Sequence, residues 1–211
     1  MQHETKQQPG RRHGSRPTDS GPTPALIEYV VGRLPAETYR VTMARMKEVS
    51  DDVLIAVDPS TAYDRVSDVT QMPRWSPENT GAVIDESPDA EHADDAYVGM
   101  TFVGSNARGG VRWRTRCEVT AADRGRRFAF RVSEYGFRRP FLKVPIASWA
   151  YTFEPVADGC RVTETWTDDR GWPDAVAAVF DRIATRKPGF AEFQRDNIRR
   201  TLDGLKAELE R

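Results

Sequence analysis

The fold is decided by a stretch that reads, from residue 111 to 119, VRWRTRCEV. Apolar or small side chains stand at every odd position, and charged side chains stand at every even one. A period of two is typical of a β-strand that buries one face and leaves the other in water. The same alternation returns in neighbouring segments, whose aromatic residues include Phe102, Phe128, Phe130, Trp149, Tyr151, Phe153 and Trp166. We therefore expect an antiparallel sheet with an aromatic inner face.

Composition narrows the class of protein. The chain has 211 residues, a formal net charge of −1 and two cysteines. This length suits one domain with a tail, and two cysteines are too few for a secreted disulfide scaffold. No apolar run reaches the roughly 20 residues of a membrane span, and the first residues lack the apolar centre of a signal peptide. So small a net charge should not draw the whole molecule to nucleic acid or to an anionic membrane. We expect a soluble, cytoplasmic protein.

Three segments divide the chain. Residues 1–24 are rich in Gln, Pro, Gly, Ser and Arg and hold no aromatic residue, which predicts a disordered tail. Residues 25–46 form an N-terminal extension that could contain two short helices. Residues 47–211 form the folded domain. Met43 lies just before the first expected strand, so the protein could also begin there, and the role of residues 1–42 stays open.

Within the domain we expect a strand, two short helices, six further strands and a long helix. Asp58 can cap the first helix, and Pro59 fits its first position, where a missing N–H is harmless. Glycine-containing turns join the later strands into hairpins. A helical region opens at Pro173, and residues 190–209 place apolar side chains on one stripe. The residues Val176, Val179, Phe180 and Ile183 share a helical face. The seven expected strands are 47–57, 82–86, 98–107, 111–122, 126–134, 146–154 and 160–167.

Several motifs of this domain are similar to those of one superfamily. They are VLIAVDP at 53–59, MPRWSPE at 72–78, GMTF at 99–102, Trp113, CEV at 117–119, WAY at 149–151, VTETW at 162–166 and NIRRTLDGLK at 197–206. Together they resemble the START-like or SRPBCC superfamily, and most of all its bacterial polyketide cyclase/dehydrase-related branch. The resemblance covers about residues 49–210.

The resemblance implies a helix-grip fold of the α+β class. In such a fold a seven-stranded, curved antiparallel sheet wraps around a long C-terminal helix, and two short helices follow the first strand. An apolar cavity lies between the sheet and the long helix. Members of the superfamily bind lipids, sterols, polyketides and other hydrophobic molecules, and some catalyse cyclisation or dehydration. Function in such a superfamily depends on the cavity rather than on the fold.

Histidine chemistry is not expected in this chain. Its three histidines, His3, His13 and His92, lie outside the expected strands and outside the C-terminal helix. We therefore expect neither a histidine base nor a histidine-rich metal site. No phosphate-cradling or dinucleotide-binding glycine motif is present in the sequence. We expect no metal and no cofactor.

Glu164 and Tyr151 are the candidate catalytic residues. Glu164 shares a strand face with Cys160, Val162 and Trp166. If that face is the inner one, burial raises the pKa of the carboxyl, and the residue could act as an acid or a base. The alternatives are a buried ion pair between Glu164 and an arginine, and a core tyrosine with a tethered hydroxyl at Tyr151.

The predicted ligand-binding residues are mostly aromatic, with a few polar groups, which is typical of small-molecule sites. They are Trp75, Phe102, Asn106, Trp113, Phe130, Trp149, Tyr151, Glu164, Trp166, Phe190, Phe193 and Asn197. Trp75 could instead anchor the short helices on the core, and Asn197 could satisfy a strand carbonyl. Our first hypothesis is a module that binds a small hydrophobic molecule of lipid, polyketide or aromatic type. The second is a polyketide cyclase or dehydratase that uses Glu164 as its acid or base.

Arginines are concentrated between residues 108 and 139. Arg112, Arg114 and Arg116 form a ladder on the side of the strand opposite the aromatic one. We expect a solvated outer face, because no aromatic residue stands between them and acids are plentiful elsewhere. A surface for an acidic partner is the third hypothesis. The sequence leaves the ligand and the oligomeric state open.

Overall fold

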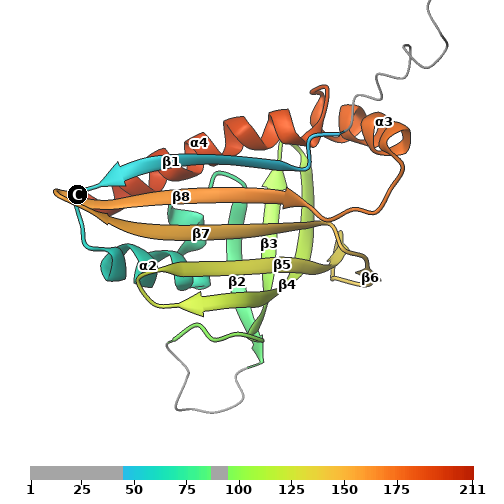
Figure 1. Cartoon of the computed structure of the whole chain (residues 1–211). Helices are drawn as coiled ribbons and strands as arrows, with labels where there is room; N and C mark the ends of the chain where they lie inside the picture. Colours follow the sequence, from blue (N-terminus) through green and yellow to red (C-terminus); the bar gives the residue numbers. More distant parts are fainter. Residues whose placement is uncertain (1–44, 87–94) are drawn as a thin grey trace, which may run out of the picture. The chain divides into compact units, whose positions relative to one another are not determined.

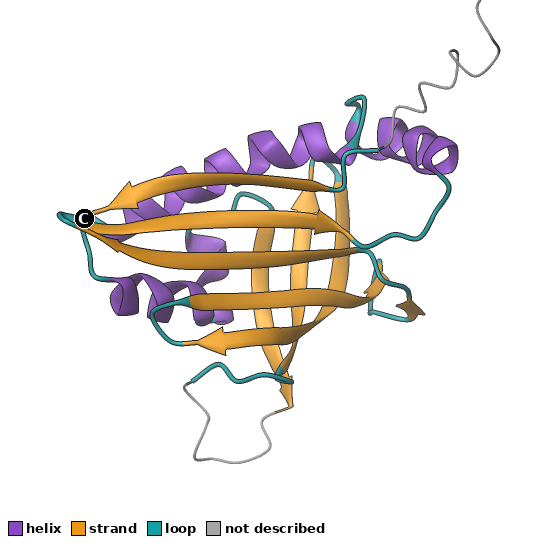
Figure 2. Ribbon diagram, viewed as in Figure 1, coloured by secondary structure: helices purple, strands orange, loops and turns teal. Residues whose placement is uncertain are grey.

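The computed structural model describes residues 45–86 and 95–211 (Figures 1 and 2). The expected tail of residues 1–24 and nearly all of the expected extension of residues 25–46 lie outside the described residues, as does His92. The elements, in chain order, are β1 (Glu48–Ile55), α2 (Pro59–Ser67), the 3-10 helix η2 (Val69–Arg74), β2 (Asn79–Glu86), β3 (Thr101–Arg108), β4 (Val111–Asp123), β5 (Arg127–Gly136), β6 (Leu142–Lys143), β7 (Ala147–Val156), β8 (Gly159–Asp168), α3 (Asp174–Thr185) and α4 (Phe190–Leu209).

The strands of the described residues form one antiparallel sheet. Its order is β1-β8-β7-β5-β4-β3-β2, and the two-residue β6 pairs with β5. Figure 1 shows that the sheet is strongly curved, because β2 and β3 run across the direction of β1, β8 and β7. The long helix α4 contacts β1 and β8. The predicted α+β helix-grip fold is confirmed, and β6 adds to the seven strands expected from the sequence.

Capping side chains determine where the two short helices begin. The carboxylate of Asp58 accepts hydrogen bonds from the backbone N–H groups of Ser60 at 3.0 Å and Thr61 at 3.1 Å, and a proline follows it as predicted. A carboxylate at a helix N-terminus also interacts favourably with the helix dipole. Asp68 caps η2 in the same way. The chain leaves η2 through Trp75, whose side chain is buried.

The strand β8 shows which face of the sheet is the inner one. Its residues alternate between half-buried and buried along the whole strand, and Glu164 falls among the buried ones. Ile198, Leu202 and Leu205 of α4 are fully buried as well. The core therefore lies between the aromatic face of the sheet and one side of α4.

The helix α3 presents its faces in an unusual way. Its buried residues are the small Ala177 and the charged Asp181. The four apolar residues that the sequence places on one face are exposed, from Phe180 at 46% to Ile183 at 77%. The predicted shared face exists, but it points to solvent rather than to the core.

Candidate functional site

A buried carboxyl and a buried hydroxyl lie opposite each other on the inner face. Glu164 on β8 and Tyr151 on β7 are direct cross-strand partners. Side chains paired in this way have Cβ atoms about 5 Å apart. The exposed fractions of the two residues are 1% and 2%. The sheet thus brings together the two residues for which the sequence suggested chemistry.

Burial controls the protonation of this pair. Desolvation raises the pKa of Glu164 to about 8, and the hydroxyl of Tyr151 offsets part of that rise. Desolvation and then the neighbouring carboxylate raise the pKa of Tyr151 well above its usual value. At neutral pH, Glu164 is therefore mostly an uncharged acid that can donate a hydrogen bond.

The carboxyl of Glu164 is incompletely satisfied. Its Oε2 atom is buried and has no hydrogen-bond partner among the described residues. Within residues 45–86 and 95–211 no arginine shifts its pKa, so a buried ion pair with an arginine of this part of the chain does not describe the site. An unpartnered buried oxygen is costly, and such groups are few in native proteins.

Trp75 lies next to Tyr151. The two rings meet edge-on, with their centroids 6.2 Å apart. The indole Nε1 is a second buried polar atom without a partner in the part of the chain that the structure describes. The helix α4 approaches closely here, because a Cβ atom at Gly204 would lie 2.6 Å from the carbonyl oxygen of Trp75. Trp75 therefore anchors the corner after η2, which is the alternative to a ligand-binding role that the sequence offered. Its indole N–H is also a hydrogen-bond donor without an acceptor in the described residues.

Aromatic rings extend from this polar centre along the sheet. Phe130 stacks on Trp149 with centroids 5.7 Å apart. Phe130 also meets Phe102 edge-on at 5.4 Å. These three predicted ligand-binding residues form one continuous wall on the inner face.

A second group of rings joins the sheet to the beginning of α4. Trp166 stacks on Phe190 at 6.5 Å, and Phe190 meets Phe193 edge-on at 6.3 Å. Trp166 is the cross-strand partner of Trp149, so the two groups are contiguous. The expectation that β7, β8 and α4 share an aromatic lining is consistent with these contacts.

Arg108 was missed as an inner residue. Its guanidinium lies 3.9 Å from the ring centroid of Phe193 and 5.4 Å from that of Trp113. It donates to Glu78 Oε1 at 2.5 Å and to the carbonyl of Ala184 at 3.3 Å. The sequence did contain the signal, since position 108 continues the inward parity of residues 102, 104 and 106. The grouping of Arg108 with the solvated outer arginines was therefore wrong.

The two predicted asparagines are placed differently. Asn106 is half-buried near a strand end, with its Nδ2 atom 3.4 Å from Thr115 Oγ1. Asn197 is buried, and its long hydrogen bonds of 3.5 Å join it to Gln194 and Arg200 of its own helix. None of these bonds reaches the buried carboxyl. The ligand-binding role of both amides stays a prediction.

A buried ionic cluster near the beginning of α4 was also not predicted. Arg170 donates to Asp168 at 2.7 Å and to Asp181 at 2.6 Å, and the three side chains are at most 3% exposed. Burial alone lowers the pKa of Arg170, but the two carboxylates raise it overall. Arg45 adds an ion pair to Asp168 at 3.3 Å. Asp181 also accepts from the backbone N–H of Phe190 at 3.1 Å, so the cluster fixes where α4 begins.

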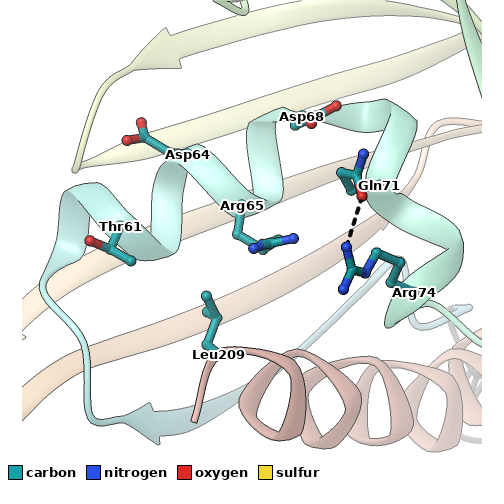
Figure 3. Close-up of a pocket in the computed structure, with 7 residues that line it drawn as sticks. All are labelled: Thr61, Asp64, Arg65, Asp68, Gln71, Arg74 and Leu209. Atoms are coloured by element: carbon teal, nitrogen blue, oxygen red, sulfur yellow. Dashed lines mark hydrogen bonds between the residues drawn. The ribbon is translucent and has the colours of Figure 1, made fainter. Parts of the chain in front are cut away.

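One hollow of the described residues is lined by polar and charged side chains rather than by the aromatic residues. It has a volume of about 500 Å³ and is lined by residues of α2, η2 and the end of α4 (Figure 3). Arg65 and Arg74 point into it, and Glu208 holds both at 3.4 Å and 2.7 Å. This charged lining ties α2 to α4 and does not suit an apolar ligand. A smaller hollow of about 210 Å³ lies where η2 meets Ile84 and Met100.

Other classes of site find little support in the described residues. No cluster of three or more His, Cys, Asp or Glu side chains that could hold a metal ion occurs in residues 45–86 and 95–211. Cys117 is buried, and desolvation raises the pKa of its thiol to about 12, which makes it a poor nucleophile. No helix in the described part of the chain has both the length and the apolar character needed to cross a bilayer.

Comparisons with known proteins identify the family and agree with the fold. The family model described as polyketide cyclase / dehydrase and lipid transport matches residues 46–210. No curated protein matches the chain. A START superfamily protein from Mycobacterium smegmatis is 12% identical, with a TM-score of 0.57 over 78% of this chain and 98% of that one. A polyketide-cyclase-like protein from Corynebacterium glutamicum is 26% identical, with a TM-score of 0.50 over 80% and 94%. The di-domain ARO/CYC protein BexL of the BE-7585A biosynthetic pathway is 18% identical, with a TM-score of 0.54 over 78% of this chain and 47% of that one.

Proposed function

The chain belongs to the polyketide cyclase / dehydrase and lipid transport family, and from that premise we propose that it binds a small hydrophobic ligand between its sheet and α4. Family and fold are consistent with a hydrophobic ligand or with polyketide cyclase-type roles. The ligand is of lipid, polyketide or aromatic type.

The observation that carries this proposal is a pair of unpartnered buried polar atoms, one on each of two side chains that neighbour Tyr151. Glu164 Oε2 and Trp75 Nε1 both lack a hydrogen-bond partner in the described residues, and Tyr151 is a neighbour of each of the two residues. A ligand with one or two oxygens on an apolar body would satisfy both atoms. The protonated Glu164 would donate to a carbonyl oxygen of the ligand, and the indole N–H would donate to the same oxygen or to the next one.

Binding can be tested with apolar probes. Oleic acid and 1-naphthol are titrated into the protein, and native mass spectrometry and thermal unfolding report the complex. At a free probe concentration one hundred times its Kd, binding raises the free energy of unfolding by about 3 kcal/mol. Both probes carry oxygen, so Trp75→Phe and Glu164→Gln should weaken the binding of each. Glu154→Gln, on the outward side of β7, should not. If neither probe binds or stabilises the protein, the proposal loses its basis.

A second candidate function is cyclisation or dehydration of a polyketide-like substrate. The observation that favours it is the raised pKa of Glu164, about 8, because a general acid is most effective when its pKa lies near the working pH. In its ionised form Glu164 would take a proton from the carbon beside a substrate carbonyl, while Tyr151 donates a hydrogen bond to the developing enolate oxygen. Glu164 would then give that proton to the leaving hydroxyl, which departs as water. Retained turnover with an unchanged pH profile in Glu164→Gln would remove the residue from the mechanism.

A further inference from the structure

Exposed apolar residues are gathered at one end of the sheet. The connection from β5 through β6 to β7 exposes Phe137, Phe141 and Leu142, with Phe141 at 67%. The four exposed aromatic side chains of the described residues are these two phenylalanines together with Trp172 and Phe180, which border or belong to α3. The patch therefore combines one loop and one helix that are far apart in the sequence.

The topology explains why these two segments lie at the same end. β5 and β8 both finish there, and β7 begins there, because neighbouring strands are antiparallel. The backbone N–H of Asp169 bonds to the carbonyl of Ile146 at 3.1 Å, which joins the two connections directly. Figure 1 shows α3 and β6 at this same end of the sheet. We call this end, made of residues 137–143 and 172–186, the apolar end.

The apolar end is also basic. Arg138, Arg139, Arg182 and Arg186 are exposed, and no acidic side chain of the described residues pairs with them. The nearby acids are engaged elsewhere: Asp181 is held by Arg170 inside the domain, and Asp174 faces Arg45 at 3.9 Å. Exposed aromatic and aliphatic groups among unpaired arginines are typical of a protein surface that lies in the interface of an anionic bilayer.

We infer that the apolar end docks on an anionic lipid surface. The apolar face of α3 points to solvent, which supports this inference. The helix buries Asp181 and Ala177, while Val179 and Ile183 are 64% and 77% exposed. A second copy of the chain is the less suitable occupant, because a symmetric contact would set four unpaired arginines against four others. The net charge of −1 conceals this local arrangement, so the expectation drawn from whole-chain charge does not apply to the apolar end.

The docked surface would adjoin the aromatic face. Phe180 of α3 stacks on Phe190 of α4 at 6.4 Å, and Phe190 stacks on Trp166 of the inner face. Exchange of an apolar ligand between bilayer and protein along these rings rests on the proposed function. The docking itself does not depend on it.

The test uses the full chain and vesicles of phosphatidylcholine with and without phosphatidylserine. Wild type should sediment with the anionic vesicles at low salt and be released as salt rises. Arg138→Glu/Arg139→Glu should weaken this binding roughly thirtyfold or more, from about 1 kcal/mol per basic residue near the surface. The matched control is Arg126→Glu/Arg127→Glu, which changes the net charge equally at the exposed beginning of β5, the opposite end of that strand from residue 137. It should bind nearly as wild type does.

A second pair of variants tests the apolar contribution. Ile183→Glu should weaken binding about tenfold or more, because a buried isoleucine side chain is worth at least about 1.5 kcal/mol. Val83→Glu, at a residue 70% exposed on β2, should not. Thermal unfolding is compared first, since exposed substitutions usually change stability by about 0.5 kcal/mol or less.

Three results would overturn the inference. One is that wild type does not bind anionic vesicles at low salt. Another is that both arginine pairs weaken binding equally, or that Ile183→Glu binds as wild type, which would assign binding to another part of the chain. The third is a dimer that Ile183→Glu dissociates without any vesicle binding, which would make the apolar end a contact between copies. Because no ligand is added, failure of the ligand proposal would leave these results unaffected.

Discussion

Replacing Glu164 with glutamine should change the pH dependence of stability in a defined direction. The folded protein holds a proton on this carboxyl up to a pKa of about 8, whereas the unfolded chain releases it near 4.5. Between these values the folded state binds more protons than the unfolded one, so stability falls as the pH rises. The contribution of Glu164 is fully present below the lower value and is lost as the pH passes the upper one.

The magnitude follows from the size of the shift. One unit of pKa difference corresponds to about 1.4 kcal/mol. Over the range from 4.5 to about 8 the wild type should therefore lose about 4 kcal/mol relative to a variant that cannot ionise at this position. Glu164→Gln has a constant cost, because its buried amide lacks partners, but that cost does not depend on pH.

The assay is urea unfolding, followed by tryptophan fluorescence, of wild type and Glu164→Gln at several pH values from about 5 to about 8. The free energy of unfolding of the variant minus that of the wild type should rise steadily, by about 3 to 4 kcal/mol in total. Glu154→Gln, an exposed residue on β7, serves as the control and should follow the wild type. A difference between Glu164→Gln and wild type that stays constant with pH would refute the protonated, buried carboxyl.

Three further predictions concern the frame around the site. Arg170→Ala should destabilise the protein by roughly 3 to 5 kcal/mol, because it leaves the buried carboxylate of Asp181 without its cation, whereas Arg161→Ala, whose side chain is 42% exposed, should cost about 1 kcal/mol or less in urea unfolding. Gly204→Ala should destabilise by roughly 1 to 3 kcal/mol, because its Cβ would collide with a backbone oxygen 2.6 Å away; Gly110→Ala, whose Cβ meets nothing within 4 Å, is the control, and equal thermal unfolding of the two would contradict the close approach. Cys117, whose pKa is raised to about 12, should resist iodoacetamide in the folded protein and react once urea is added, as mass spectrometry would show; rapid labelling of the native protein would disprove its burial.

Alternation alone was enough to predict the inner face of the sheet. The period of two placed Glu164 with Cys160 and Trp166, and all three are buried on β8. The alternation can be seen within each strand's own sequence, without knowledge of its neighbours. It also sets the register, because a one-residue slip would turn every side chain to the other face. The order of strands around a long C-terminal helix came from the family resemblance, which the fold confirms.

Features that depend on side chains meeting across the fold were not predictable from such patterns. The cluster of Arg170 with Asp181 joins the end of β8 to α3, and nothing in either segment alone indicates the partner. Arg108 reaches the rings of α4 because its long side chain can bury its stem and still find an acceptor. Periodicity in α3 identified an apolar face, but it cannot tell on which side of the helix the domain lies.

The most direct measurement of the central claim is the indole N–H signal of Trp75 in a two-dimensional NMR spectrum of the labelled protein. Trp75→Phe assigns the signal, and an apolar probe that carries one oxygen, such as 1-naphthol, is then added. Because Nε1 of Trp75 is buried near Tyr151 and has no hydrogen-bond partner among the described residues, we expect this signal to move on saturation. The signal of the exposed Trp172 should stay in place. If the probe binds and the Trp75 signal does not move, the aromatic face between the sheet and α4 is not the ligand site.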